Sequence, residues 1–190
     1  MSMRSLNRIL FALACATTVV YSSAGFSHSQ TSPKNARLLI QKMPLRKKIG
    51  QLFLVGFNGK RWEEGLQSTL TSVGPGGIVV FGRNLQSARQ ISDLLLKAQN
   101  YSLKSVGLPL LVATDQEGGD VIRIKTEIPL PSALAIGRSG DSAIAERAGE
   151  ATGGLLKILG INMNLAPVLD VASNKQQGFL GSRSYGTDPA

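Results

Sequence analysis

Gly76-Gly77-Ile78-Val79-Val80-Phe81 is the stretch that decides the fold class of this chain. Four consecutive apolar residues follow two glycines, a pattern typical of a strand buried on both faces of a parallel sheet. Two further apolar runs, at 110–113 and 161–166, have the same character. The sequence therefore predicts three buried strands.

Amphipathic helices are predicted between these strands. Ser87-Ala88-Arg89-Gln90 has the form of a capping box, and apolar residues follow it at helical spacing. A second helix precedes the run at 161–166 and ends at Gly160, which suits a left-handed cap. The resulting βαβαβ series predicts a parallel sheet covered by helices, as in a barrel or a doubly wound sheet.

The loops after the predicted strands favour the barrel. Neither G-x-G-x-x-G nor G-x-x-x-x-G-K-[ST] follows a strand, which counts against the nucleotide-binding folds. We therefore predict an α/β fold of the (β/α)8 TIM-barrel type. Because a complete barrel takes about 250 residues, we expect the chain to hold roughly the first half of one, with a naturally short domain as the alternative.

The N-terminal residues 1–24 resemble an export signal. Arg4 and Arg8 form a basic start, the apolar run 9–20 is too short to span a bilayer, and small residues lie at 22–24. We expect cleavage near Ala24, a periplasmic or secreted location, and no stable membrane insertion afterwards. An uncleaved membrane anchor is the alternative.

The polar stretch 25–33 is predicted to be a linker, and the domain proper is expected to occupy residues 34–190. Its first part, 34–57, predicts two short helices that break at Met43-Pro44, because the residue before a proline is pushed out of the helical region. In the second helix, an apolar face is expected from residues at helical spacing. These residues are Leu45, Ile49, Leu52, Phe53 and Gly56.

Composition excludes several kinds of chemistry. Cys15, the only cysteine, lies in the leader, and His28, the only histidine, lies in the linker. A thiol nucleophile, a Ser-His-Asp triad and a histidine metal site therefore cannot be built from the expected domain, and we expect no metal and no cofactor. The net charge of +9 permits anionic partners, but no basic stripe interleaved with aromatic residues supports nucleic acid.

Polar side chains follow each predicted strand, at the edge where barrel enzymes carry their sites. Thr114-Asp115-Gln116-Glu117-Gly118-Gly119 is the most informative of these loops. Its glycines would let backbone approach a ligand, and Asp115 would present oxygens to the hydroxyl groups of a sugar. Equally, Asp115 could cap a turn that the glycines merely allow to bend.

Other polar residues near these loops are open to two interpretations. Arg123 and Arg183 could point their guanidinium groups into a sugar pocket or lie as surface cations. Arg83 and Asn84 could line a pocket or form a turn, and the turn is slightly favoured. We expect Asp170 to be a structural carboxylate at the end of a strand.

Five ordered motifs between residues 34 and 190 give the chain a resemblance to glycoside hydrolase family 3. The motifs are Lys48-Ile49-Gly50-Gln51-Leu52, Gly77 to Phe81 with Arg83-Asn84, Asp115-Gln116-Glu117-Gly118-Gly119, Leu165-Ala166-Pro167-Val168-Leu169-Asp170-Val171, and Gly181-Ser182-Arg183-Ser184-Tyr185-Gly186. The Asp-Gln-Glu-Gly-Gly form implies the β-N-acetylhexosaminidases, which remove terminal N-acetylglucosamine from cell-wall fragments; a family 3 β-glucosidase is the alternative.

The resemblance also implies roles for single residues. Asp115 would bind sugar hydroxyls, and Arg123 and Arg183 would complete the pocket for the sugar. The family usually has arginine after the two glycines, whereas this chain has Asp120. That departure affects the charge and support of the loop more than sugar binding.

The resemblance implies a retaining mechanism, in which a carboxylate attacks the sugar and water later releases it. The nucleophilic aspartate and the histidine proton donor are expected after Ala190, so we expect no catalytic residue in this chain and no activity from it alone. The expected partner is an N-acetylglucosamine-containing glycan or peptidoglycan fragment, and the full-length protein is expected to be a monomer. Alternatives are a non-catalytic carbohydrate-binding remnant, Asp115 and Glu117 as a catalytic pair, and a phosphate-handling barrel.

Overall fold

The computed structural model describes residues 33–172 and 180–188, so the predicted leader and linker lie outside the described residues except for Pro33. The elements, in chain order, are α2 (Pro33–Lys42), α3 (Leu45–Gly50), β1 (Leu54–Gly56), α4 (Glu64–Ser72), β2 (Gly77–Val80), the 3-10 turn η1 (Gly82–Asn84), α5 (Ala88–Ser105), β3 (Leu111–Thr114), α6 (Ala133–Ser139), α7 (Ser142–Leu159), β4 (Met163–Asn164) and the 3-10 turn η2 (Gly181–Arg183). Within the described part, no helix is long and apolar enough to cross a membrane.

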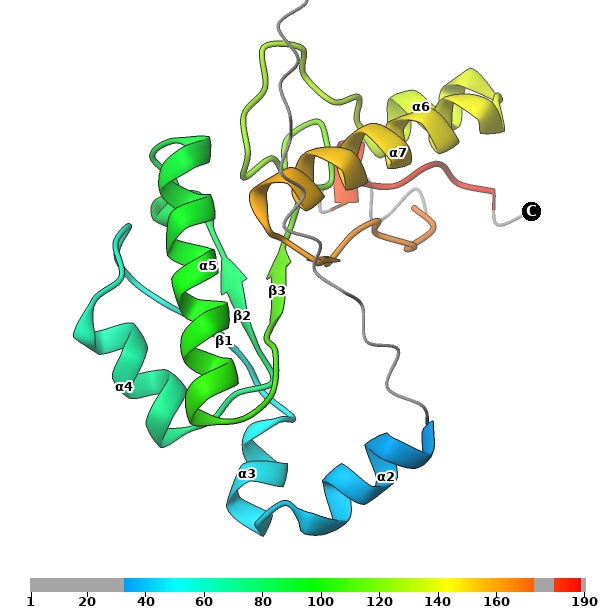
Figure 1. Cartoon of the computed structure of the whole chain (residues 1–190). Helices are drawn as coiled ribbons and strands as arrows, with labels where there is room; N and C mark the ends of the chain where they lie inside the picture. The colour runs from blue at the N-terminus through cyan, green and yellow to red at the C-terminus, as the bar shows by residue number, and fades with distance from the viewer. Residues whose placement is uncertain (1–32, 173–179, 189–190) are drawn as a thin grey trace, which may run out of the picture. The chain divides into compact units, whose positions relative to one another are not determined.

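The four strands form one parallel sheet in the order β1-β2-β3-β4. Each strand therefore lies beside the next strand of the sequence, with helices on the connections (Figure 1). A doubly wound sheet would reverse its strand order at some point. The uniform order is that of consecutive units of a (β/α)8 barrel, and the predicted α/β barrel-type fold is confirmed.

The hydrophobic core lies between the sheet and the helices that follow its strands. Ile78 and Val112, on neighbouring strands, are fully buried against Ile91 and Leu95 of α5 and Leu159 of α7. The opposite face of the sheet is more open at its amino-terminal end: Leu54 and Leu111 both pair in register with Gly77 and remain partly exposed, whereas Val79 and Ala113 on the same face are buried. The helices thus cover one face of the sheet among the described residues.

The predicted helix boundaries hold at two ends. The Ser87 hydroxyl accepts a hydrogen bond from the Gln90 amide at the start of α5, while the Gln90 side chain accepts from the Gln86 amide rather than from that of Ser87. The cap is therefore present, but its reciprocal bond is shifted by one residue. Gly160 ends α7 with a φ of +84°, the left-handed conformation that glycine adopts at low cost.

The second predicted N-terminal helix is wrong in its latter half. Helix α3 ends at Gly50, and Leu54–Gly56 instead forms strand β1, which pairs with β2. A Cβ at Gly50 would lie 2.1 Å from the Val73 carbonyl oxygen, so the chain passes too close to its neighbour for an ordinary helical residue. Strand pairing therefore outweighs the helical spacing of the apolar residues. The apolar face expected there does not form either, because Leu52 and Phe53 are exposed.

Candidate functional site

The loop after β3 lies at the carboxyl-terminal edge of the sheet, and its two glycines fold it onto the chain's own backbone. Gly118 has a φ of +89° and Gly119 a φ of +58°. A Cβ at Gly118 would lie 2.2 Å from the Pro131 carbonyl oxygen, and one at Gly119 would lie 2.6 Å from the Ser132 Cβ. The geometry therefore supports the interpretation that these glycines allow a bend.

Gln116 holds this loop together from inside. Its side chain is buried, with only 2% of the residue exposed. The Oε1 atom accepts hydrogen bonds of 3.0 Å from the backbone amides of Arg123 and Ile124, and the Nε2 atom donates to the Ile124 carbonyl at 2.9 Å. Gln116 thus fixes the distance between the start of the loop and Arg123, a role that the sequence did not indicate.

Asn164 joins the same loop to strand β4. Its Oδ1 atom accepts from the Gln116 amide at 3.0 Å and its Nδ2 atom donates to the Gln116 carbonyl at 3.0 Å. Asn162 makes a similar pair of bonds to the Val112 amide and the Leu110 carbonyl. Two asparagines within a run predicted to be a buried strand were the available signal, because polar side chains there would need hydrogen-bond partners. In the structure Asn162 is exposed and Asn164 is partly buried.

Asp115 and Arg123 lie side by side, as one interpretation of the sequence required. The Arg123 Nη2 atom donates to the Asp115 Oδ2 atom at 3.0 Å, and the side chains are 32% and 23% exposed. Arg123 Nε is buried and has no partner among the described residues. The pair therefore keeps hydrogen-bonding capacity beyond its single mutual bond.

Arg183, on the η2 turn, reaches the same loop through Glu117 rather than Asp115. Its Nε and Nη2 atoms donate to the two Glu117 carboxylate oxygens at 2.9 and 2.8 Å, and the Glu117 side chain is only 8% exposed. This is the bidentate geometry that favours arginine over lysine. The hydrogen bond and the charge of Glu117 raise the pKa of Arg183, and the charges of Asp170 and Asp115 add to the effect.

A second bond connects the β3 loop to the η2 turn. The Ser182 hydroxyl donates to the Asp120 Oδ2 atom. Asp120 occupies the position after the two glycines, where the resemblance to glycoside hydrolase family 3 implies an arginine. Together with the Glu117–Arg183 ion pair, this hydrogen bond connects the β3 loop to the η2 turn at two neighbouring positions.

Ser184 fixes the other side of the η2 turn. It is buried, and its hydroxyl donates to the Asp170 carbonyl at 2.8 Å while accepting from the Ala172 amide at 3.2 Å. The Asp170 side chain is exposed, and its charge lies close enough to influence Arg183. The backbone at Asp170 therefore helps to position the turn that carries Arg183.

The loop after β2 forms a turn. Asn84 is fully buried; its Nδ2 atom donates to the Phe57 and Gly59 carbonyls at 3.0 and 2.9 Å, and its Oδ1 atom accepts from the Phe81 amide at 2.9 Å. Arg83 instead lies over the Phe81 ring, 4.4 Å from its centre. Between the two interpretations of Asn84, the structure supports the turn.

A cavity of about 330 Å³ lies beside the loop after β3, between that loop and α7. Its wall includes Glu117 and Tyr185, and on α7 the small residues Ala148, Gly149 and Gly153. Asp115, Arg123 and Arg183 are not among its lining residues. Among the described residues, no group of three or more His, Cys, Asp or Glu side chains could hold a metal ion.

Comparison with known proteins places this arrangement in a family. The model described as "Glycosyl hydrolase family 3 N terminal domain" matches residues 44–190, which is more than half of the chain. The chain belongs to glycoside hydrolase family 3. The match includes the β3 loop and the η2 turn, and it begins after helix α2.

Relatives of this family 3 chain carry hexosaminidase names. Beta-hexosaminidase A of Pseudoalteromonas piscicida is 37% identical over 121 residues, 60% of this chain and 20% of that protein. A beta-hexosaminidase of Pseudomonas aeruginosa is 32% identical over 60% of this chain and 33% of its own length. The chain thus spans between a fifth and a third of these relatives.

Solved structures agree with the fold. A glycoside hydrolase family 3 beta-N-acetylglucosaminidase from Paenibacillus sp. str. FPU-7 has a TM-score of 0.74 and 38% identity, covering 77% of this chain and 28% of that one. Native NagZ from Neisseria gonorrhoeae has a TM-score of 0.62 and 28% identity, covering 72% of this chain and 40% of that one.

Proposed function

We propose that this chain supplies the sugar-binding part of a glycosidase that removes terminal, non-reducing N-acetyl-β-D-hexosamine residues, principally N-acetylglucosamine, from glycans or cell-wall fragments. Asp115, Arg123 and Arg183 are the proposed sugar contacts. The Asp115–Arg123 pair carries the proposal, because it combines a charged acceptor and charged donors at the site edge of the sheet.

The chemistry of this pair suits sugar hydroxyl groups. A carboxylate offers about four acceptor positions, of which Asp115 uses one within the described part of the chain. Arg123 Nε is a buried donor without a partner there, and such a donor costs about 1–3 kcal/mol. An adjacent pair of hydroxyls, one donating and one accepting, would satisfy both residues after a small shift of the guanidinium group.

We propose a retaining mechanism for the whole enzyme, with its nucleophilic carboxylate and proton donor outside residues 1–190. Glu117 is a poor candidate for either role, because both of its oxygens are engaged by Arg183. Asp115 and Glu117 also point to different arginines, whereas a retaining pair must face one bond from about 5 Å apart. Their proposed roles are therefore binding and support.

The names of the relatives support the choice of N-acetylated sugar over glucose. Beta-hexosaminidase and beta-N-acetylglucosaminidase are the names of proteins 37% and 38% identical to this chain. A family 3 β-glucosidase remains the competing function, since the same carboxylate and guanidinium groups would also bind the hydroxyls of glucose. A carbohydrate-binding remnant would share the binding but belong to no active enzyme.

The test is a titration of the 190-residue chain with N-acetylglucosamine and, separately, with glucose, followed by amide chemical shifts. We expect binding of N-acetylglucosamine in about the millimolar range, as a few hydrogen bonds would provide, with shifts centred on Asp115 and Arg123. Glucose should bind more weakly. Equal or stronger binding of glucose would favour the β-glucosidase, and binding of neither sugar would contradict the proposal.

A parallel assay separates binding from cleavage. The same chain, incubated with an aryl N-acetylglucosaminide, should release no aryl alcohol above background. Hydrolysis at a rate comparable to that of a full-length relative would show that the catalytic groups lie within residues 1–190 and would overturn that part of the proposal.

A further inference from the structure

Arg183 lies between two serines whose hydroxyl groups are both hydrogen-bonded. Ser184, which follows it, donates to the Asp170 carbonyl oxygen at 2.8 Å. Ser182, which precedes it, donates to the carboxylate of Asp120. The first bond joins the η2 turn to the segment after β4, and the second joins it to the β3 loop. The backbone at Arg183 is therefore fixed on both sides.

The turn that carries Asp120 is itself held by backbone hydrogen bonds. The Glu117 amide donates to the Val121 carbonyl at 3.0 Å, which closes the turn. The Gly119 amide donates to the Leu130 carbonyl at 3.1 Å, which joins the turn to the segment before α6. Because Asp120 lies between these bonded residues, its carboxylate is a fixed acceptor for the η2 turn.

We propose that Asp120 is a positioning residue for Arg183: by accepting the proton of the Ser182 hydroxyl, it fixes the backbone from which the Arg183 guanidinium group reaches a sugar. This inference rests on the proposed function, in which Arg183 is a sugar contact. It adds to that function a residue that touches no sugar and acts on binding through its neighbour.

The contact of Arg183 with Glu117 does not replace this role. Glu117 engages the Nε and Nη2 atoms, which is two of the five N–H donors of the guanidinium group. That contact holds the end of a long side chain, whose several rotatable bonds allow more than one backbone position. The direction of the other donors, which would reach the sugar, depends on the backbone as well.

A carboxylate at position 120 suits this task. An ionised carboxylate only accepts hydrogen bonds, so it takes the proton that the Ser182 hydroxyl donates. The arginine that the family resemblance implies at this position has donors only and could not accept that proton. The contact is thus a feature of this chain. Its expected effect is modest, because Asp120 is exposed and Ser182 is only partly buried.

The experiment measures the affinity of the 190-residue chain for N-acetylglucosamine by amide chemical shifts. Asp120→Ala and Ser182→Ala should each weaken binding about fivefold, as expected for one lost hydrogen bond. The double variant should bind no more weakly than either single variant, because both remove the same bond. Ser182→Ala changes a single oxygen atom, so it also serves if Asp120→Ala folds poorly.

Two variants separate the hydrogen bond from the charge and from general effects. Asp120→Asn should bind nearly like the wild type, because its amide oxygen still accepts from Ser182. Asp93→Ala, which removes an exposed aspartate from α5, should leave binding unchanged. Rescue by asparagine would not occur if the negative charge itself were needed.

The action through Arg183 is tested in a chain without that arginine. Arg183→Gln should by itself weaken binding about tenfold. Adding Asp120→Ala to it should cause no further loss. In the chain that keeps Arg183, Asp120→Ala should also shift the Arg183 Nε–H resonance, which reports on the guanidinium group directly. The control Asp93→Ala should leave that resonance in place.

Three results would overturn the proposal. The first is wild-type affinity in folded Asp120→Ala and Ser182→Ala chains. The second is an equal loss in Asp120→Asn and Asp120→Ala, which would assign the effect to charge. The third is a loss from Asp120→Ala that is as large without Arg183 as with it. Wild-type affinity in Arg183→Gln would instead contradict the proposed sugar contact, and the positioning role would fall with it.

Discussion

The two ion pairs of the β3 loop differ in what they leave available. Asp115 and Arg123 are eight residues apart, share one hydrogen bond, and are about a quarter to a third exposed. Glu117 and Arg183 are 66 residues apart, share two hydrogen bonds, and bury the carboxylate. Carboxylates two positions apart thus have opposite environments.

The difference suggests a division of labour. A bidentate pair between distant segments engages both oxygens of its carboxylate and two of the five N–H donors of its arginine, so its main effect is to hold the η2 turn against the loop. A single bond within one loop leaves positions free for a ligand. Changes at the Glu117–Arg183 pair should therefore lower the stability of the fold. Changes at the Asp115–Arg123 pair should weaken sugar binding.

The largest expected effect on stability comes from Gln116, which lies between the two carboxylates. Gln116→Ala leaves two amides and a carbonyl of the Arg123–Ile124 segment without partners. We expect a loss of about 3–4 kcal/mol in the free energy of unfolding, from the cost of unpaired buried polar groups. Urea denaturation measures it, and Gln86→Ala, at an exposed side chain, is the control. Equal losses would show that the loop does not depend on Gln116.

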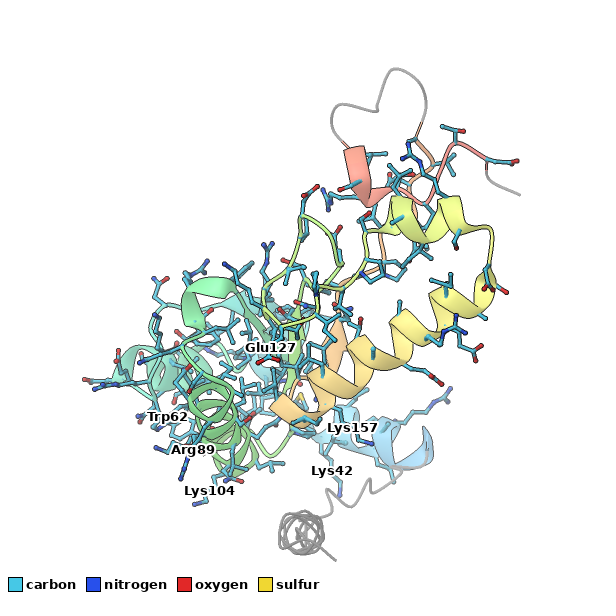
Figure 2. All side chains as sticks on the ribbon, turned by 90° about the horizontal axis from the view of Figure 1, so that it is seen from above. Lys42, Trp62, Arg89, Lys104, Glu127 and Lys157 are labelled. Atoms are coloured by element: carbon cyan, nitrogen blue, oxygen red, sulfur yellow. The ribbon has the colours of Figure 1, made fainter. Side chains whose placement is uncertain are left out.

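Breaking the Glu117–Arg183 pair, which connects the β3 loop to the η2 turn, should have the next largest effect on stability. Glu117→Ala removes both bonds to Arg183. We expect a loss of about 2 kcal/mol, less than the 3–5 kcal/mol of a fully buried pair because the Arg183 side chain is a third exposed. Glu127→Ala, at an exposed loop position labelled in Figure 2, is the matched control. A change within about 0.5 kcal/mol of that control would contradict the structural role of the pair.

The exposed pair should matter little for stability. Asp115→Asn keeps the size of the side chain and can still accept from Arg123 through its amide oxygen. We expect a change of no more than about 1 kcal/mol in the free energy of unfolding, as for other partly exposed pairs. Thermal or urea unfolding would detect a larger loss, which would mean that Asp115 is mainly a structural residue.

The smallest expected effect is that of pH on the Glu117–Arg183 pair. Glu117 raises the pKa of Arg183, which in an unfolded chain already lies far above neutral pH. A raised pKa contributes stability that is complete below the unfolded value and is lost only as pH rises through the folded value. The stability difference between the wild type and Arg183→Gln should therefore stay constant between about pH 7 and about pH 10. A steady decline over that range would mean that another group controls the pair.

Local sequence patterns were sufficient for much of the fold. The apolar run Ile78–Phe81 and its two successors predicted the three strands β2, β3 and β4, and Gly160 predicted the end of α7. Strand β1 was missed because Leu45 to Gly56 has helical spacing, and only its pairing with β2 makes Leu54–Gly56 a strand. Pairing between distant segments cannot be read from periodicity.

The site shows the same limit. The sequence singled out Asp115, Arg123 and Arg183, and the structure places the first two in contact. The partner of Arg183 was not predicted, because Glu117 lies 66 residues away. The scaffold role of Gln116 was also missed, since a glutamine in a loop gives no sign of burial until the segments around it are folded.

The most direct test of the division of labour is the affinity of the chain for N-acetylglucosamine, measured by amide chemical shifts in Asp115→Asn and in Asp93→Asn, an exposed control on α5. We predict that Asp115→Asn weakens binding about ten- to a hundredfold while the chain stays folded, as expected for losing a charged acceptor. The control should bind like the wild type. Unchanged affinity in a folded Asp115→Asn chain would contradict the account.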